Sequence, residues 1–271
     1  MPEIKSDSGE MTFWEHLDDL RGTLIRSFIA IFIATIGAFL LKDFIYNTII
    51  LGPRNADFFT NRMLCKLSHI MNSEVLCINQ GTFEIINIDL AGQFRSHLLI
   101  SIVAGLIIGF PYFLFELWRF IKPGLYKKEI RNMKGFVFWT SFLFFIGISF
   151  GYFMIAPLAI NFLINYTISP DVVNQIRLGS YISNVVLICL STGIVFELPL
   201  LIYFLSRMGV ITPKLMKKYR KHAVVFFFIA SAIITPPDVF SQILVALPLL
   251  FLYEISIIIS RRTVKKYALG G

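Results

Sequence analysis

Charged side chains are scarce in this sequence. Only 15% of its 271 residues are Asp, Glu, Lys or Arg, whereas soluble domains contain about 25%. Hydrophobic residues make up 56% of the chain, and the mean hydropathy is +0.72. Apolar runs of about 20 residues, the length needed to cross a bilayer as a helix, recur along the chain. This composition excludes an ordinary soluble domain and indicates a protein that spans a membrane several times.

The sequence also lacks the short motifs that mark several common enzyme sites. It contains no HExxH, CxxC or G-x-x-x-x-G-K-[ST] pattern. The lack of a phosphate-binding loop argues against an ATP-driven motor in this chain. We therefore expect no enzyme activity, no catalytic residue, no cofactor and no metal site. The few histidines are too scattered to assemble a metal cluster from the sequence, and they are His16, His69, His97 and His222.

Cysteine is rare as well, with three residues in the chain. Cys65 and Cys77 lie in a long segment that we expect to be exported, where an oxidising exterior permits a disulfide. Sequence spacing does not test the geometry of such a bridge, so paired and free thiols both remain open. Either way, we expect their role to be structural. Cys189 lies within an apolar run, and we interpret it as a packing residue.

Six apolar runs predict an all-α membrane protein with six transmembrane helices, forming a single polytopic domain over residues 1–271. The fifth and sixth spans are expected to be short. The fifth run has only 12 residues, which rise about 18 Å as a helix against a hydrocarbon core of about 30 Å. We expect it to thin the bilayer locally or to form a shallow hairpin with the sixth run. The predicted spans are approximately 22–41, 97–117, 135–161, 181–205, 223–234 and 239–259.

Basic residues are distributed unevenly between the two sides of these spans. Most of the 25 Lys and Arg residues lie near the N-terminus or after the even-numbered spans. The positive-inside rule then places both termini in the cytoplasm, so 42–96 is a long exported loop and 260–271 a cytoplasmic tail. We read the net charge of +8 as a sign of topology and lipid contact, not of nucleic-acid binding. The first 21 residues hold no apolar stretch, so we expect no cleavable signal, and we expect the plasma (inner) membrane as location.

The N-terminal 1–21 segment has a helical pattern of its own. Apolar residues recur at helical spacing from Phe13 to Leu24, which predicts a cytoplasmic interfacial helix leading into the first span. Its polar face carries Asp19 and Arg21. From composition alone, this face is equally well interpreted as an ordinary solvated surface.

A single acid, Glu197, interrupts the apolar run at 189–205. A carboxylate at the centre of a spanning helix costs about 2.5–3.5 kcal/mol to insert, so such residues usually face a cavity or a polar partner. We interpret two other acids near or within the spans, Glu116 and Glu254, as packing or snorkelling residues. Glu197 is therefore the strongest candidate for a functional group inside the membrane.

Prolines fall inside or near the ends of four spans. Each removes a backbone donor and is expected to bend its helix, so we predict that the helices form a concave wall with Glu197 on its concave side. The GxxxG spacings at 105–109 and 147–151 predict close helix contacts for the second and third spans. The prolines are Pro111, Pro157, Pro199 and Pro248.

Four stretches of the sequence are distinctive in their order and placement. They are HLDDLR at 16–21, FPYFLFELWRFIKPGLYKKEIR at 110–131, FELPLLI at 196–202 and TPPDVFSQ at 235–242. The chain resembles the TatC family, the multi-span receptor subunit of the twin-arginine protein translocase, over nearly its whole length. It departs from the family's usual H-L-x-E-L-R pattern at Asp19. Its first exported loop is also longer than usual, so the cysteines there inherit no family role.

The resemblance implies that the protein recognises twin-arginine signal peptides on folded precursor proteins. Asp19, Arg21, Phe120 and Glu129 match the family's signal-peptide-binding region. Carboxylates suit this task because each can accept two parallel hydrogen bonds from a guanidinium group. Glu129 also has a plainer interpretation, since it could merely temper repulsion among the basic residues around it.

The resemblance further implies export driven by the proton-motive force, with single-span partners of the TatA and TatB types and a homo-oligomer within a hetero-complex. Glu197 would meet the partner helices, which carry a polar residue within their own membrane segment. We group with it the TPPDVFSQ residues Pro236, Pro237, Asp238 and Gln242 as a partner-helix and translocation region.

The alternative function is a proton-coupled small-molecule transporter that uses Glu197 as its intramembrane carboxylate. Many carriers are built from two inverted halves with paired interrupted segments. The first three predicted spans contain no counterpart of TPPDVFSQ. A purely structural scaffold would leave Glu197 and the cytoplasmic acids unexplained.

Overall fold

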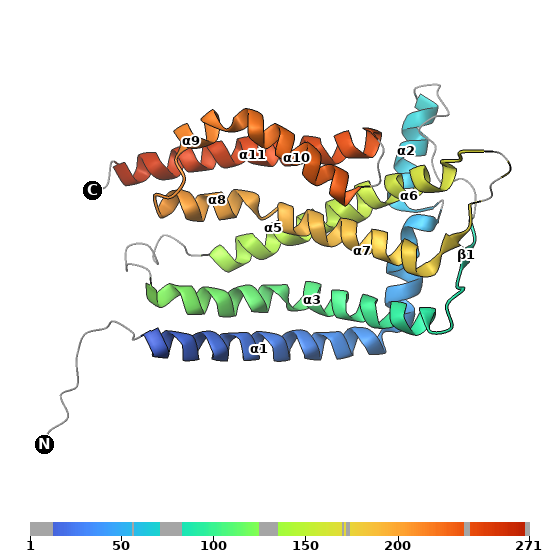
Figure 1. Cartoon of the computed structure of the whole chain (residues 1–271), viewed down its shortest axis with the longest axis horizontal. Coiled ribbons are helices and arrows are strands. Elements are labelled where there is room, and N and C mark those ends of the chain that lie inside the picture. The colour runs from blue at the N-terminus through green and yellow to red at the C-terminus, as the bar shows by residue number, and fades with distance from the viewer. Residues whose placement is uncertain are drawn as a thin grey trace, which may run out of the picture.

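Most helices of the protein run roughly side by side along its long axis, with α2 (Phe59–Ile70) standing across them at one end (Figure 1). The computed structural model describes residues 13–55, 57–70, 83–124, 135–169, 171, 174–235 and 239–268. Helix α1 (Phe13–Leu40) begins and α11 (Val239–Ala268) ends at the same end of the molecule. We call this the terminal end, and we call the opposite end, where α1 ends and α3 (Gly92–Ile121) begins, the loop end.

The all-α prediction is confirmed in its main feature, because most of the described chain is helical. The exception is a pair of two-residue parallel strands at the loop end, in which Ile85 pairs with Ile176 and Ile86 with Arg177. The remaining elements, in chain order, are η1 (Phe44–Ile50), η2 (Gly52–Arg54), β1 (Ile85–Ile86), η4 (Lys122–Gly124), α5 (Phe136–Phe150), η5 (Gly151–Ile155), α6 (Ala156–Asn165), β2 (Ile176–Arg177), α7 (Leu178–Val195), α8 (Leu198–Arg207), α9 (Pro213–Lys218) and α10 (Arg220–Ile234).

Within the described residues, four helical stretches are long and apolar enough to cross a membrane. They overlap the first four predicted spans and extend past most of their ends, because polar residues at the ends of an apolar run can continue the helix. Helix α10 has 15 residues and α11 has 30, so membrane crossing by the fifth and sixth spans stays a prediction. The four stretches are Trp14–Leu40, Gly92–Ile121, Phe136–Asn165 and Leu178–Arg207.

Two pairs of helices approach closely through glycines. A Cβ atom added at Gly105 of α3 would lie 2.6 Å from the backbone nitrogen of Thr35 in α1. One added at Gly147 of α5 would lie 2.7 Å from the carbonyl oxygen of Thr192 in α7. The predicted small-residue contacts therefore exist, and they join α3 to α1 and α5 to α7.

The second glycine pair also forms the sequence Gly147-x-Ser149-x-Gly151, which has the G-x-S-x-G form of a hydrolase nucleophile motif. That motif requires a sharp turn between a strand and a helix. Here it lies within α5 and at the start of η5, in continuous helical backbone. The pattern therefore serves helix packing and gives no support to a nucleophilic serine.

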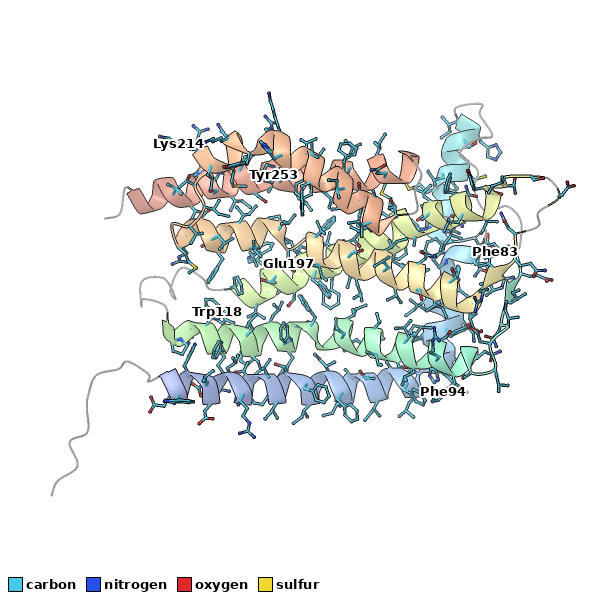
Figure 2. The ribbon with its side chains drawn as sticks, in the orientation of Figure 1. Phe83, Phe94, Trp118, Glu197, Lys214 and Tyr253 are labelled. Carbon is cyan, nitrogen blue, oxygen red and sulfur yellow. The ribbon has the colours of Figure 1, made fainter. Side chains whose placement is uncertain are left out.

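The fourth apolar run is interrupted at Glu197. Pro199 has no backbone N–H to donate to the carbonyl four residues earlier, so α7 ends at Val195 and α8 begins at Leu198. At the interruption the N–H of Glu197 donates to the Ile194 carbonyl oxygen at 3.1 Å, a three-residue spacing. Figure 2 shows Glu197 near the middle of the molecule, where the two helices meet.

The other prolines leave their helices unbroken. Helix α3 continues through Pro111 and α11 continues through Pro248. Pro157 lies in the first turn of α6, where a proline needs no hydrogen-bond partner. Bending at these positions, and the concave wall it would produce, stay predictions.

Large apolar side chains cover the outside of the bundle. Phe28, Phe32 and Ile33 of α1 are more than half exposed, although the same helix packs along α3 on its other side. The fully buried positions lie between helices, as with Ile182 of α7 and Leu249 of α11. This distribution is expected when lipid rather than water is the surrounding solvent.

Candidate functional site

The terminal end joins the beginning of α1 to the end of α3. The His16 ring stacks on the Phe120 ring, with centroids 4.4 Å apart and planes inclined by 20°. Asp19 follows His16 by one helical turn, so the two residues are neighbours on the surface of α1. The structure therefore brings Asp19 and Phe120, two of the predicted signal-peptide-binding residues, to one surface.

The other two residues of that predicted set are placed differently. Arg21 is exposed, but five residues beyond His16 it lies on another face of α1. Glu129 lies outside the described residues, so its position relative to Asp19 stays a prediction. Figure 2 shows Trp118 of α3 at the same end of the molecule, and its ring lies 4.9 Å from that of Phe136 in α5.

Asp19 is an exposed carboxylate with no ion-pair partner among the described residues. Its neighbour Asp18 is also exposed, but two residues beyond His16 it lies on the opposite side of the helix. An unpaired carboxylate beside a stacked pair of rings can bind a ligand that carries a cation and an apolar side chain.

Sequence reasoning missed a partly buried ion pair that joins α1 to α3. The Arg26 Nε donates to Glu116 Oε2 at 2.8 Å, and the Tyr112 hydroxyl donates to Glu116 Oε1 at 3.2 Å. Glu116 is only 2% exposed. Its interpretation as a simple packing or snorkelling acid therefore needs correction, because both of its oxygens are bound. The sequence did contain a signal for this pair. Acids in membrane spans usually pair with bases, and Arg26 is a base in an otherwise apolar stretch.

Glu254, interpreted from the sequence as a packing or snorkelling acid, also has a specific partner. Arg220 Nε of α10 lies 2.6 Å from Glu254 Oε1 of α11. Both side chains are substantially exposed, so this pair stabilises the contact between the two helices only modestly.

Glu197 differs from these acids because one of its oxygens has no partner. Its Oε1 is buried and makes no hydrogen bond with any described residue. The backbone of Phe144 in α5 approaches the carboxyl group, and the hydroxyl of Ser141, one turn earlier in α5, is also buried without a partner. A buried polar atom without a hydrogen bond costs about 1–3 kcal/mol. The unsatisfied oxygen is therefore an energetic cost that the described residues do not offset.

Gln242 belongs to the contact between α10 and α11. Its amide nitrogen donates to the Phe228 carbonyl oxygen at 3.0 Å, which ties the beginning of α11 to α10. Pro236, Pro237 and Asp238, which we grouped with it from the sequence, lie outside the described residues. The structure thus gives Gln242 a role in holding the helix pair and leaves its part in translocation as a prediction.

The two described cysteines are in different states, one disulfide-bonded and one a free thiol. Cys65 of α2 is disulfide-bonded. Its predicted partner Cys77 lies outside the described residues, so the identity of the pair stays a prediction. Cys189 is a free thiol and packs in the buried core near the loop end. In the part of the chain that the structure describes, no three His, Cys, Asp or Glu side chains converge to hold a metal ion.

Comparison with known proteins gives consistent matches along most of the chain. The family model for Sec-independent protein translocase protein (TatC) matches residues 15–248. A TatC protein of Blattabacterium sp. subsp. Periplaneta americana is 39% identical over 265 residues, covering 97% of this chain and 100% of the relative. The Aquifex aeolicus TatC is 32% identical over 257 residues, covering 94% and 97% respectively.

Solved structures agree with the sequence matches. A crystal structure of the twin-arginine translocase receptor TatC superposes with a TM-score of 0.70 at 33% identity, covering 92% of this chain and 99% of that one. A second crystal structure of such a receptor, in DDM, gives a TM-score of 0.71 at the same identity.

Proposed function

Because this chain belongs to the TatC family of Sec-independent protein translocase proteins, we propose that it recognises twin-arginine signal peptides and exports folded proteins with TatA- and TatB-type partners. As a member of this family it is a membrane-embedded translocase component. The finer parts of the proposal are six spans, a concave wall of proline-bent helices, an inner-membrane location with both termini in the cytoplasm, and assembly into a homo-oligomer within a hetero-complex.

The observation that carries signal-peptide recognition is the stack of His16 on Phe120. It holds the beginning of α1 against the end of α3 and presents Asp19 on the same surface. Asp19 can accept two parallel hydrogen bonds from one guanidinium of the signal, and the ring of Phe120 can contact an apolar residue beside it. A second arginine needs a second carboxylate, and we assign that role to Glu129.

The buried carboxylate of Glu197 supports the second part of the proposal, contact with partner helices. Its Oε1 has no hydrogen-bond partner among the described residues, and Ser141 offers a hydroxyl on the adjacent helix α5. A polar side chain within a single-span partner would bind the carboxyl group of Glu197, since the residue as a whole is only partly buried. Since the 15 residues of α10 rise only about 22 Å, a bilayer thinned beside the α10–α11 pair would favour short partner helices. We propose that the proton-motive force drives export, as the family resemblance implies.

The acids of the proposed signal site can be tested one at a time. Glu129→Gln should strongly weaken crosslinking to a twin-arginine precursor. Asp19→Asn should weaken it less, because the Asp19 side chain is shorter by one methylene group than the Glu that the family usually has at this position. Losing a hydrogen bond to a charged group is worth about 1.5–3 kcal/mol, which is roughly tenfold or more in affinity. Asp18→Asn is the matched control, since it removes an exposed acid from the other side of the same helix. Unchanged crosslinking in both site variants at normal expression would contradict the assignment.

No observation favours the proton-coupled transporter considered from the sequence. The carboxylate that suggested it, Glu197, lies at a helix interruption with one oxygen left unsatisfied by the described residues, and this arrangement suits a docked polar group as well as a proton. We therefore do not propose a carrier function.

A further inference from the structure

A cavity of about 530 Å³ lies at the loop end, far along the molecule from the proposed signal-peptide site. It is lined by the segment that follows α1, the π-helical turn η1, the 3-10 turn η2, strand β1 and the first turns of α3. Cavities that bind small ligands typically measure about 300–1,000 Å³, so this one has room for a small polar group. Its lining includes Lys42, Asp43, Tyr46, Arg54, Gln93 and His97.

The walls carry charges of both signs that no described residue neutralises through an ion pair. Lys42, Asp43 and Arg54 take part in none of the ion pairs among the described residues. The Arg54 guanidinium lies over the Phe83 ring, 5.4 Å from its centroid, which positions the cation but leaves its charge in place. Burial raises the pKa of Tyr46, so its hydroxyl stays a neutral hydrogen-bond donor. The cavity thus offers two cations, one carboxylate and a hydroxyl donor.

The cavity also lies where the membrane spans end. Lys42 follows the last residue of α1, Leu40, by two positions, and Phe94 lies in the first turn of α3. Apolar side chains beside it point outward, with Leu40 exposed by 76% and Phe94 by 64%. Figure 2 shows Phe94 at this end, where α1 ends and α3 begins. A polar pocket bordered by exposed apolar side chains at this level matches an amphipathic ligand with a charged head and apolar chains.

We propose that this cavity binds the headgroup of a phospholipid that carries both a phosphodiester and a primary ammonium group. The phosphodiester would lie between Arg54 and Lys42, because guanidinium and ammonium groups both bind phosphate oxygens. The ammonium would donate hydrogen bonds to Asp43. The acyl chains would run along the exposed faces of Leu40 and Phe94. A free phosphate ion shares the anionic part of this chemistry but has neither the ammonium nor the chains.

The test is a binding titration of the purified full chain in detergent, followed by native mass spectrometry. Phosphatidylethanolamine supplies both charges with N–H donors, phosphatidylcholine has a quaternary ammonium without donors, and inorganic phosphate has no chains. For the wild-type chain we expect phosphatidylethanolamine to bind about tenfold more tightly than phosphatidylcholine, because one additional charge-assisted hydrogen bond raises the affinity by about that factor. Inorganic phosphate at millimolar concentration should not displace it.

Two variants test the contacts of the ammonium group and of the phosphodiester separately. Asp43→Asn should reduce phosphatidylethanolamine binding to the level of phosphatidylcholine and leave phosphatidylcholine unchanged. Arg54→Gln should weaken both lipids about equally, because both carry the phosphodiester. Arg95→Gln is the matched control, since this exposed arginine lies in the first turns of α3 outside the cavity lining.

The outcomes are distinct. Equal binding of the two lipids to the wild-type chain, or equal effects of Arg54→Gln and Arg95→Gln, would overturn the proposal. Displacement of lipid by inorganic phosphate, dependent on Arg54, would instead identify a phosphate-ion site and would overturn the lipid assignment. Asp43→Asn replaces one exposed side chain by another of the same shape, so its result does not depend on a loss of folding.

Discussion

Glu116 illustrates what a single buried carboxylate contributes to this protein. It is 2% exposed and receives hydrogen bonds from both Arg26 and Tyr112, so neither oxygen is left without a partner. Removing one member of a fully buried ion pair typically destabilises a protein by about 3–5 kcal/mol, and we expect a smaller loss here because the Arg26 side chain is 44% exposed. Replacing both members avoids that penalty. The pair therefore predicts a clear non-additivity between substitutions in α1 and α3.

We expect Arg26→Gln alone to lower the thermal unfolding midpoint of the detergent-solubilised chain more than Arg26→Gln combined with Glu116→Gln. The reason is that the single variant leaves the Glu116 carboxylate buried without a cation. Thermal unfolding measured by intrinsic fluorescence checks this, with Arg62→Gln, an exposed arginine of α2, as control. Equal or larger loss in the double variant would show that the ion pair does not hold α1 against α3.

Glu197 gives the second prediction at the scale of one residue. Glu197→Ala should leave binding of the twin-arginine signal intact, because Glu197 lies near the middle of the molecule, whereas Asp19 and Phe120 lie where α1 begins and α3 ends. It should reduce crosslinking to the partner helix and block export, since the polar group that the partner would bind is gone. Glu197→Gln, which keeps a hydrogen-bonding group, should retain more of the partner crosslink. Export of folded substrate at the wild-type rate by Glu197→Ala would make this residue a tolerated buried acid.

These two acids also show what could be predicted from the sequence at this scale. Glu197 stands out because it is an isolated acid in an apolar run, and that isolation is visible in the sequence alone. The partner of Glu116 is not visible in the same way, because Arg26 lies 90 positions away. Knowing that they meet requires the register between α1 and α3, which hydropathy does not specify.

At the scale of helices, glycines set how closely neighbours pack. Gly105 of α3 lies against the backbone of Thr35, and Gly109 one turn further on lies against Ile31. A Cβ atom at Gly105 would meet backbone rather than a flexible side-chain end, so α1 and α3 would have to separate. The Arg26–Glu116 pair bridges the same two helices, and its geometry depends on this spacing.

We therefore expect Gly105→Ala to lower the thermal unfolding midpoint of the solubilised chain. Gly37→Ala is the matched control, because a Cβ atom there has nothing within 4 Å. The control should be neutral or slightly stabilising, since alanine favours helix by about 0.5–1 kcal/mol over glycine. Circular dichroism during heating measures both variants. If Gly105→Ala has the same thermal unfolding midpoint as Gly37→Ala, the close contact of α1 with α3 is wrong.

The helices themselves were partly predictable. The first four spans follow from long apolar runs, but the missing donor of Pro199 does not by itself predict the break between α7 and α8, because Pro111 and Pro248 lack the same donor inside unbroken helices. The π-helical turns η1 and η5 were not predictable, because they arise from tertiary contacts. The Tyr152 and Tyr181 hydroxyls, for example, donate to the carbonyl oxygens of Ile49 and Ile50 in η1. The site was predictable only in part, since its pairing of His16 with Phe120 joins two helices far apart in the sequence.

At the scale of the whole molecule, the two ends differ in chemistry. The terminal end presents the Asp19 carboxylate, which has no ion-pair partner among the described residues, beside stacked rings, whereas the loop end is tied together by β1 and β2 and by the Arg177–Asp89 ion pair. Helix α1 begins and α11 ends at the terminal end, an arrangement that the proposed six membrane crossings would require. The proposed function places the signal peptide at this end and the partner helices near the middle.

The most direct test of this account is a comparison of two precursors that differ only in the paired residues of their signal peptides. Lysine keeps the positive charge of arginine but cannot form two parallel hydrogen bonds with one carboxylate. The account predicts that the full chain in membranes retains the twin-arginine precursor roughly tenfold or more over the twin-lysine precursor in co-purification. Equal retention of the two precursors would contradict recognition of the arginine pair by this chain.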